Sequence, residues 1–204
     1  VFWSHHGLKF ANEKVLQYIF NRDILDIGAF CGDSLTVLIN YTSKKVCSIE
    51  YSPLNVETIK NAIITNHLDK NKIILLSKGV GNKSEIIKTK FSDSGASKIQ
   101  KQESGSTIQI TTIDEEVIKN NLTVGFMKAD IEGMEIQALQ GAEKTIKKDR
   151  PVISFSIYHN FQGLFGIRHF LEKFPNYTFQ YQIGSWDYQT LGELIIFAYP
   201  NELS

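Results

Sequence analysis

The chain has 204 residues, of which 22 are Lys or Arg and 22 are Asp or Glu, so its formal net charge is zero. This length suits one sizeable core, and we expect a single domain over residues 1–204. A neutral balance argues against nucleic acid as the main partner, which normally requires a basic face. No apolar run approaches the roughly 18 residues of a membrane span, and no signal peptide is visible.

The N-terminal part, residues 1–20, is expected to form a flap followed by a helix. Residues 1–7 are rich in aromatic side chains and contain His5 and His6. Neighbouring side chains diverge on a helix and alternate on a strand, which makes these two histidines a poor metal pair. We therefore expect this segment to pack over the sheet or over a cofactor. The apolar spacing of residues 12–20 predicts the helix.

The chain is organised around its first strand, turn and helix. Residues 24–27 are an apolar run broken by one acid, which is typical of a buried parallel strand. Gly28 and Gly32 then bracket a tight turn, and Asp33 or Ser34 can cap the helix that follows. These elements make the first half of a βαβ unit, and such turns lie at the carboxyl edge of the sheet, where ligands bind.

The composition of this turn distinguishes between nucleoside cofactors. A dinucleotide fingerprint would need glycine at positions 28, 30 and 33, and the chain has Phe30 and Asp33 instead. An aspartate at the helix start would repel a pyrophosphate. S-adenosylmethionine has no phosphate, and acids at Asp26 and Asp33 would suit its ammonium and sulfonium groups. We therefore expect S-adenosylmethionine, and a nicotinamide oxidoreductase is disfavoured.

A third acid follows at the end of the second expected strand, residues 45–50. Glu50 lies 22 residues after Gly28, where a carboxylate would accept two hydrogen bonds from a ribose diol. A third strand, residues 72–76, runs into the glycine loop at 77–82, which would border an adenine pocket or be a plain turn. The two cysteines, Cys31 and Cys47, indicate reduced thiols and favour a cytoplasmic protein.

The rest of the chain alternates strands and helices. Strand signals at 84–91 and 100–113 predict a small β-excursion with a polar loop at 92–97 between them. The other expected elements are a helix at 54–66 opened by Pro53, a strand at 124–130, a helix at 132–147, a strand at 151–158, a helix at 161–174, and a hairpin of 177–183 with 193–199. This order predicts a doubly wound, mainly parallel, Rossmann-like α/β sheet with an antiparallel C-terminal hairpin.

A second acidic stretch ends the strand at 124–130. Asp130 closes that strand, and Glu132 is expected to open the next helix. Asp130 is therefore placed to face the transferable methyl group, to cap the helix, or to do both. Asp130, Glu132 and His159 are all placed at carboxyl strand ends. His159 is the expected general base, and Asp130 would orient cofactor or acceptor because an ordinary Asp is a weak base at neutral pH. No tight ligand motif supports a metal site of these three residues.

Several ordered motifs together resemble one family. They are Asp26-Ile-Gly-Ala-Phe-Cys-Gly-Asp33, Ile49-Glu-Tyr-Ser-Pro53, Thr112-Ile-Asp114, and Lys128-Ala-Asp-Ile-Glu-Gly-Met-Glu-Ile136 followed by Ala138-Leu-Gln-Gly-Ala142. From about Gly7 to Pro200 the chain is similar to the FkbM-type S-adenosylmethionine-dependent methyltransferases. The resemblance implies a class I methyltransferase fold and O-methylation, commonly of sugar or polyketide hydroxyls. The chain departs from relatives that have Glu-Pro after the second strand, where it has Glu50-Tyr-Ser-Pro53.

These arguments lead to a set of expected site residues. The expected cofactor-binding residues are Asp26, Gly28, Ala29, Phe30, Gly32, Asp33, Ser34, Glu50, Tyr51, Ser52, Lys78, Gly79 and Asp130. The expected catalytic residues are His159, Asp130 and Glu132, with a hydroxylated small molecule or glycan as acceptor and no metal. The alternative is a non-catalytic module of the same fold that binds a nucleoside-like ligand and needs no base.

Overall fold

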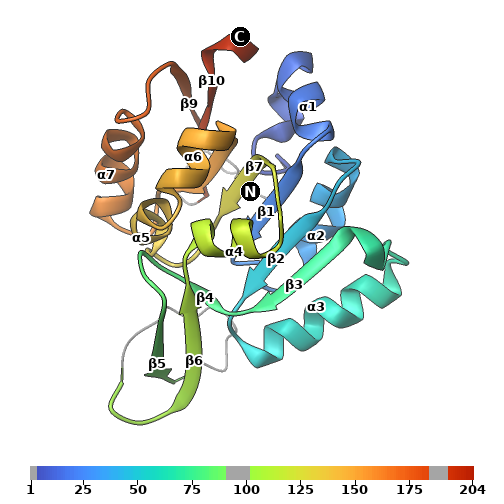
Figure 1. Ribbon diagram of the computed structural model, residues 1–204, viewed down its shortest axis with the longest axis vertical. Helices are drawn as coiled ribbons and strands as arrows, with labels where there is room; N and C mark the ends of the chain where they lie inside the picture. Colours follow the sequence, from blue (N-terminus) through green and yellow to red (C-terminus); the bar gives the residue numbers. More distant parts are fainter. Residues whose placement is uncertain (1–3, 91–101, 184–192) are drawn as a thin grey trace.

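The computed structural model describes residues 4–90, 102–183 and 193–204, which form a central sheet with helices on both faces (Figure 1). The sheet has seven strands in the order β3-β2-β1-β7-β8-β10-β9. Its strands are β1 (Asp23–Ile27), β2 (Val46–Glu50), β3 (Ile73–Ser77), β7 (Val124–Ala129), β8 (Val152–Ser156), β9 (Tyr177–Ile183) and β10 (Leu194–Pro200). The neighbours β3, β2, β1, β7 and β8 pair in parallel, and β10 pairs antiparallel with both β8 and β9. The expected sheet and C-terminal hairpin are confirmed.

Seven helices cover this sheet within the described ranges. They are α1 (Glu13–Phe20), α2 (Asp33–Leu38), α3 (Pro53–Thr65), α4 (Ile113–Lys119), α5 (Glu135–Gln140), α6 (Glu143–Asp149) and α7 (Phe161–Leu171). Short 3-10 turns occur at Leu8–Phe10, Ile39–Tyr41, Lys70–Lys72 and Asn201–Leu203. None of these described helices is long and apolar enough to cross a membrane.

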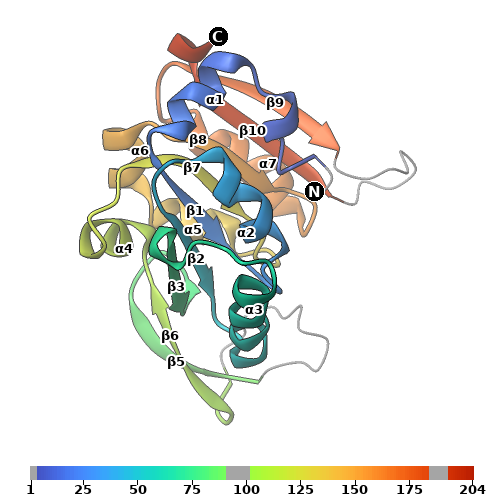
Figure 2. The same cartoon turned by 90° about the vertical axis from the view of Figure 1, so that its right-hand side faces the viewer.

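The helices divide the core between the two faces of the sheet (Figure 2). On one face α1, α2 and α3 contribute Val15, Leu35 and Ile59 to a buried apolar cluster. On the other face α4 to α7 pack on a second cluster that includes Leu139 and Ile167. Strands β1, β2 and β8 are buried along their whole length. Burial on both faces explains why these strands are near-continuous apolar runs in the sequence.

The expected β-excursion is a second sheet of three strands, β4 (Gly79–Val80), β6 (Ser106–Thr111) and β5 (Glu85–Thr89), in the order β4-β6-β5. It projects below the main sheet (Figure 1). The strand expected at 100–113 extends beyond the observed end of β6 at Thr111. Thr112 instead caps α4, because its side chain accepts a hydrogen bond from the Glu115 amide. Three acids in the first turn of α4 support this start. Residues 92–97 lie outside the described part of the chain.

Two expectations about helix starts are wrong. The helix expected at 132–147 is two helices, α5 and α6, and it does not begin at Glu132. Glu132 and Gly133 have φ angles of 55° and 97°, which place them in the left-handed region and exclude them from a helix. Asp130 therefore does not cap α5, whose N-cap is Met134 without a side-chain cap. At α2 the N-cap is Gly32 with φ 86°, again without a side-chain cap, rather than Asp33 or Ser34.

Candidate active site

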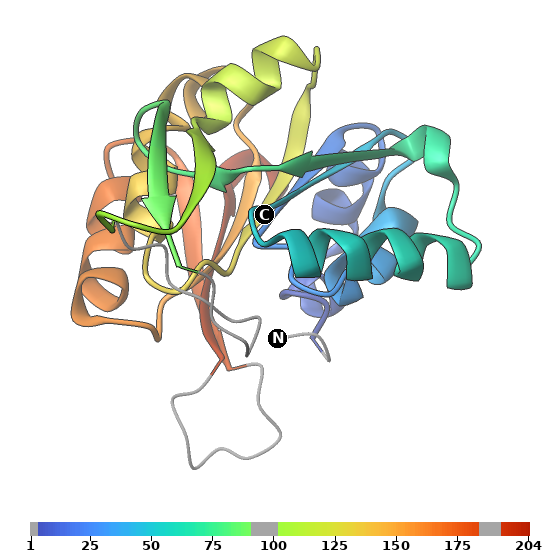
Figure 3. The ribbon, with the colours of Figure 1, turned by 90° about the horizontal axis from the view of Figure 1, so that it is seen from below.

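A pocket of about 300 Å³ lies at the carboxyl edge of the sheet. Figure 3 views the molecule from below, the side toward which β1 and β2 point in Figure 1. The pocket is lined by His6, Ile27, Gly28, Phe30, Asp33, Ser34, Ile49, Glu50, Tyr51, Lys78, Gly79, Val80, Lys128, Asp130, Ile131, Glu132, Met134, Tyr158 and Glu193. Most of these residues lie at the carboxyl ends of β1, β2, β3, β7 and β8 or directly after them, so the site lies where an open α/β sheet binds ligands.

The glycine turn after β1 is shaped by the neighbouring strand. Gly28 has φ 76°, and its amide donates to the carbonyl of Ile49 at 2.9 Å. A Cβ at Gly28 would overlap the carbonyl oxygen of Asp130 and lie 2.8 Å from Cγ2 of Ile131. Glycine is therefore required at this position because the residues that follow β7 pack directly against the turn. Close approach by a ligand would be a second reason for glycine here.

Glu50 lies on the pocket wall at the end of β2. Its Oε2 accepts from the Phe30 amide at 3.0 Å, and its Oε1 accepts from the Ser52 amide at 2.8 Å. Burial raises the pKa of this carboxyl, and the backbone hydrogen bonds from Ser52 and Phe30 act in the opposite direction. Each carboxylate oxygen has more than one lone-pair site. The same group can therefore hold the turn and accept a ribose hydroxyl.

Asp26 has a different environment from the one expected. Its side chain is 0% exposed and lies behind the pocket wall, 3.1 Å from Nζ of Lys128. Lys128 also donates to the carbonyl of Gly28 at 2.7 Å. Burial lowers the pKa of Lys128, but the charges of Asp26 and Asp130 outweigh that effect and raise it. The charge of Asp26 is thus compensated by Lys128, and Asp33 is the acid of this turn that lines the pocket.

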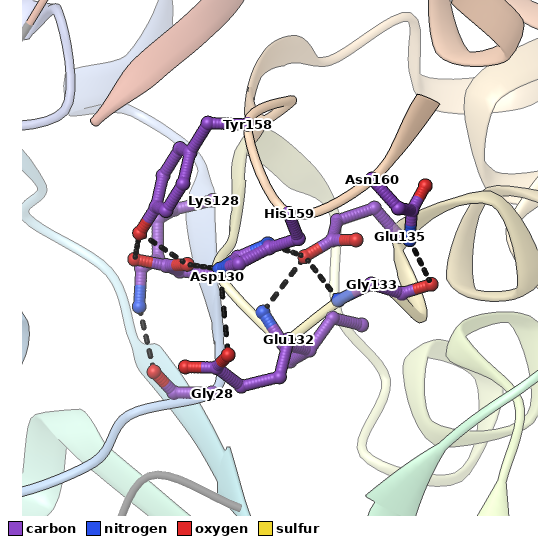
Figure 4. Close-up of polar contacts among 10 residues, drawn as sticks. Gly28, Lys128, Asp130, Glu132, Gly133, Glu135, Tyr158, His159 and Asn160 are labelled. Atoms are coloured by element: carbon purple, nitrogen blue, oxygen red, sulfur yellow. Dashed lines mark hydrogen bonds and ion pairs between the residues drawn. The ribbon is translucent and has the colours of Figure 1, made fainter. Parts of the chain in front are cut away.

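The other end of the pocket is acidic (Figure 4). Asp130 and Glu132 lie on its wall, and the hydroxyl of Tyr158 donates to Oδ1 of Asp130 at 3.3 Å. Behind them is His159, whose Nε2 is 3.3 Å from Oδ1 of Asp130 and 3.8 Å from Oε2 of Glu132. The structure therefore brings together the three residues expected to act on the acceptor, with His159 as the innermost.

Glu135 orients His159 and was missed in the sequence. Its side chain is 1% exposed, and its Oε1 lies 2.9 Å from Nδ1 of His159. The same oxygen accepts from the amides of Ile131 and Gly133, so Glu135 also holds the turn before α5. Burial lowers the pKa of His159, but the hydrogen bond to Glu135 and the surrounding carboxylates outweigh it and raise the pKa. The surrounding carboxylates thus stabilise the protonated form of the imidazole.

His6 and Lys78 mark two further walls. His6 is buried, lines the pocket, and its Nε2 lies 2.8 Å from Oγ of Ser34. His6 belongs to the segment expected to form a flap, of which residues 1–3 lie outside the described chain. Lys78 pairs with Glu116 at 2.6 Å on the β3 side of the pocket, next to Gly79.

The expected residues can now be sorted by position. On the pocket wall are Gly28, Phe30, Asp33, Ser34, Glu50, Tyr51, Lys78, Gly79, Asp130 and Glu132. The other expected residues, Asp26, Ala29, Gly32, Ser52 and His159, do not line the pocket. The pocket residues that sequence reasoning missed include His6, Lys128 and Tyr158. A signal for Lys128 was present, because it is the one charged residue in the buried strand β7.

A model of the FkbM methyltransferase domain matches residues 26–182. The chain belongs to the FkbM methyltransferase family. The match contains the glycine turn, Glu50 and the Lys128–Glu135 stretch, and it confirms the family resemblance stated from the sequence. The assignment to this methyltransferase family also confirms S-adenosylmethionine as the expected cofactor.

Solved structures support the fold of this FkbM domain. An FkbM methyltransferase from Methylobacillus flagellatus has a TM-score of 0.67 and 24% identity, covering 88% of this chain and 44% of its own. The present chain thus spans less than half of that protein. An O-methyltransferase from Bacillus cereus, in complex with SAH, has a TM-score of 0.59 and 17% identity, covering 97% and 80%.

A third similar structure is named as a methylase of ribosomal RNA. This rRNA methylase from Streptococcus thermophilus has a TM-score of 0.57 and 9% identity, covering 92% of both chains. At such identities the likeness shows the class I methyltransferase fold alone. No curated protein matches the chain.

Proposed function

We propose that this FkbM domain transfers the methyl group of S-adenosylmethionine to a hydroxyl oxygen of a polyhydroxylated small molecule of the sugar class. Glu50 would hold the cofactor ribose, Asp33 the ammonium group, and the wall at Lys78 and Gly79 the adenine. The methyl group would then point toward Asp130. The neutral net charge of the chain gives no electrostatic reason to favour a nucleic-acid acceptor.

The acidic end of the pocket is the observation that carries this proposal. Asp130 and Glu132 both line the wall there. Carboxylates only accept hydrogen bonds, and hydroxyl groups are the donors that sugars offer. Two neighbouring carboxylates would therefore fix a diol in one orientation, and fixing donor and acceptor in line supplies much of the rate of a displacement.

The transfer balances without an added reagent. The hydroxyl oxygen forms a bond to the methyl carbon while the carbon–sulfur bond breaks. The electron pair of the broken bond stays on sulfur and gives S-adenosylhomocysteine. The oxygen then carries a methyl group and its original proton, which makes it strongly acidic. The carboxylate of Asp130 can accept that proton although it would be too weak a base for a free hydroxyl. In this arrangement His159 positions Asp130 rather than acting as the base.

The test is turnover with defined acceptors. The protein is incubated with S-adenosylmethionine and a panel of free sugars, nucleotide sugars and phenols, and S-adenosylhomocysteine and the methylated atom are identified. We expect an O-methyl product, and about 10²–10⁴-fold slower turnover for Asp130→Asn. Glu57→Gln, an exposed change on α3, is the matched control. Methylation of carbon or of RNA contradicts the proposal, and cofactor binding without any transfer supports the non-catalytic alternative.

A further inference from the structure

We propose that Asp130, Glu132 and His159 form a binding site for one divalent transition-metal ion at the acceptor end of the pocket. The proposal deepens the proposed function and rests on it for its chemical role, because an ion there would bind the acceptor hydroxyl. The site itself is argued from the geometry of the three side chains.

The first observation is a buried nitrogen without a hydrogen bond. The His159 side chain is only 9% exposed, and within the described ranges its Nε2 has no hydrogen-bond partner. Nδ1 faces Oε1 of Glu135 at 2.9 Å. Because a carboxylate only accepts, Nδ1 carries the hydrogen in that contact. Metal binding requires the neutral imidazole, in which the lone pair then lies on Nε2 and faces Asp130 and Glu132.

The second observation is the spacing of the facing atoms. Nε2 of His159 is 3.3 Å from Oδ1 of Asp130. Two atoms each about 2.1 Å from a shared ion are about 3.0 Å apart at a right angle and about 3.4 Å apart at the tetrahedral angle. The separation observed lies between these values. The distance from Nε2 to Oε2 of Glu132 is longer, 3.8 Å, and the Glu132 side chain is 44% exposed, so binding of the ion would need that side chain to move closer.

The surroundings also match a metal site. A ligating histidine usually donates its other ring hydrogen to a carboxylate, which fixes its orientation, and Glu135 has this position. The oxygen of Glu135 that faces His159 already accepts two amide hydrogens, from Ile131 and Gly133. Glu135 is therefore a positioning residue, although ligand atoms of Asp130, Glu135 and His159 lie within 4.8 Å of one another.

The charge balance favours a cation. Asp130, Glu132 and Glu135 bring three carboxyl groups to His159. Lys128, which also lines the pocket, is paired with Asp26. One imidazole with two carboxylates is a mixed donor set that suits Mn²⁺ or Zn²⁺ better than Ca²⁺ or Mg²⁺. Three protein ligands leave coordination positions open for hydroxyl oxygens, whose acidity a bound cation increases.

Calorimetric titration with MnCl₂ and with ZnCl₂ tests the site without acceptor or cofactor. Tag-free protein is stripped with a chelator and compared with Asp130→Asn, Glu132→Gln and His159→Asn, and circular dichroism checks that each variant is folded. We expect one ion per chain and more than about 100-fold weaker binding in the Asp130 and His159 variants. Glu135→Gln should weaken binding by about 10–100-fold, while Glu57→Gln should bind as the wild type does. Glu132→Gln changes a side chain that is 44% exposed, so it should stay folded and still bind the ion more weakly than the wild type. It tests the site even if Asp130→Asn or His159→Asn unfolds.

Turnover measured with and without the chelator separates this proposal from the proposed function. Absence of binding at millimolar Mn²⁺ and Zn²⁺ overturns the metal site, and so does equal binding by the wild type and all folded variants. If O-methylation persists in the chelator, the proposed function stands and the metal has no role in it. Ion binding that depends on His159 together with no O-methylation of any acceptor supports the site and contradicts the proposed function.

Discussion

Lys128 shows how much of the site depends on single side chains. It is buried in β7, donates to the carbonyl of Gly28 and neutralises Asp26. Breaking a buried ion pair by removing one partner costs about 3–5 kcal/mol because the other charge is left without compensation. The pair thus fixes the glycine turn from behind, while Asp33 lines the pocket.

We predict that Lys128→Met lowers the free energy of unfolding by about 3–5 kcal/mol, since Asp26 then remains buried and charged. The double variant Asp26→Asn/Lys128→Met should recover much of this loss. Urea denaturation of both variants and of Asp26→Asn alone measures the coupling. Equal stability of Lys128→Met and wild type would show that the pair contributes nothing.

Glu50 accepts hydrogen bonds from the backbone amides of Phe30 and Ser52, and we propose that the same carboxylate holds the cofactor ribose. We predict that Glu50→Ala weakens S-adenosylmethionine binding by about 1.5–3 kcal/mol, the range for hydrogen bonds to charged groups. Glu50→Gln keeps an acceptor for one backbone amide and should lose less affinity. Calorimetric titration with the cofactor measures both. Unchanged affinity in a folded Glu50→Ala protein removes the ribose assignment.

Among the elements, the turn after β1 and the end of β7 form one unit. The Asp130 amide donates to the carbonyl of Ile27 at 3.1 Å, and the Asp130 carbonyl fills the space that a Gly28 side chain would need. A change in either segment therefore displaces the other. This is how the turn on the pocket wall sets the position of the acidic residues that follow β7.

We predict that Gly28→Ala lowers stability by about 2 kcal/mol or more, because it adds left-handed strain to steric overlap, and that it also weakens cofactor binding. The matched control is Gly163→Ala in α7, where an added Cβ meets no atom closer than 3.5 Å. That change should be neutral or slightly stabilising. Thermal unfolding measures the stability, and titration with S-adenosylmethionine measures the affinity. A Gly28→Ala protein with the stability and affinity of the wild type would contradict the overlap between this Cβ and the Asp130 carbonyl.

Across the molecule as a whole, the N-terminal segment is fastened to the glycine-turn helix. His5, His6 and Gly7 all have positive φ angles, and the bend they make turns the ring of His6 toward Ser34 at the start of α2. The pKa of His6 is lowered well below 6.5, mainly by burial and next by the charge of Lys128. The fold therefore contains this histidine in its neutral form.

A pH dependence of stability follows from His6. Below a pH of about 6.5 the unfolded chain binds a proton at this residue that the native state excludes, so stability falls as the pH falls toward the native pKa. His6→Asn should reduce the loss of stability between about pH 7 and pH 5.5, measured by urea denaturation at several pH values. His169→Asn, at an exposed position on α7, is the control. The same pH profile in His6→Asn and wild type contradicts the assignment.

Much of the architecture follows from contiguous residues. The apolar run Ile24–Ile27, the glycines after it and the alternation of later segments predict the strand order along the chain, because periodicity and turn chemistry act over a few neighbouring positions. Glu50 was found in the same way, as an acid that directly ends a buried strand. The errors were also local. Left-handed angles at Glu132 and Gly133 interrupt a stretch whose apolar spacing is helical on both sides.

The contacts that make the site depend on which strands become neighbours. Strand β1 lies between β2 and β7, and the β1–β7 register sets Asp26 opposite Lys128. Glu135 meets His159 because β7 and β8 end side by side, and His6 meets Ser34 across 28 positions. A local pattern states which residue type ends a strand, but partners arise from packing between distant segments. The acids that end strands were therefore readable in the sequence, whereas the partners that packing brings to them, such as Glu135 beside His159, were not.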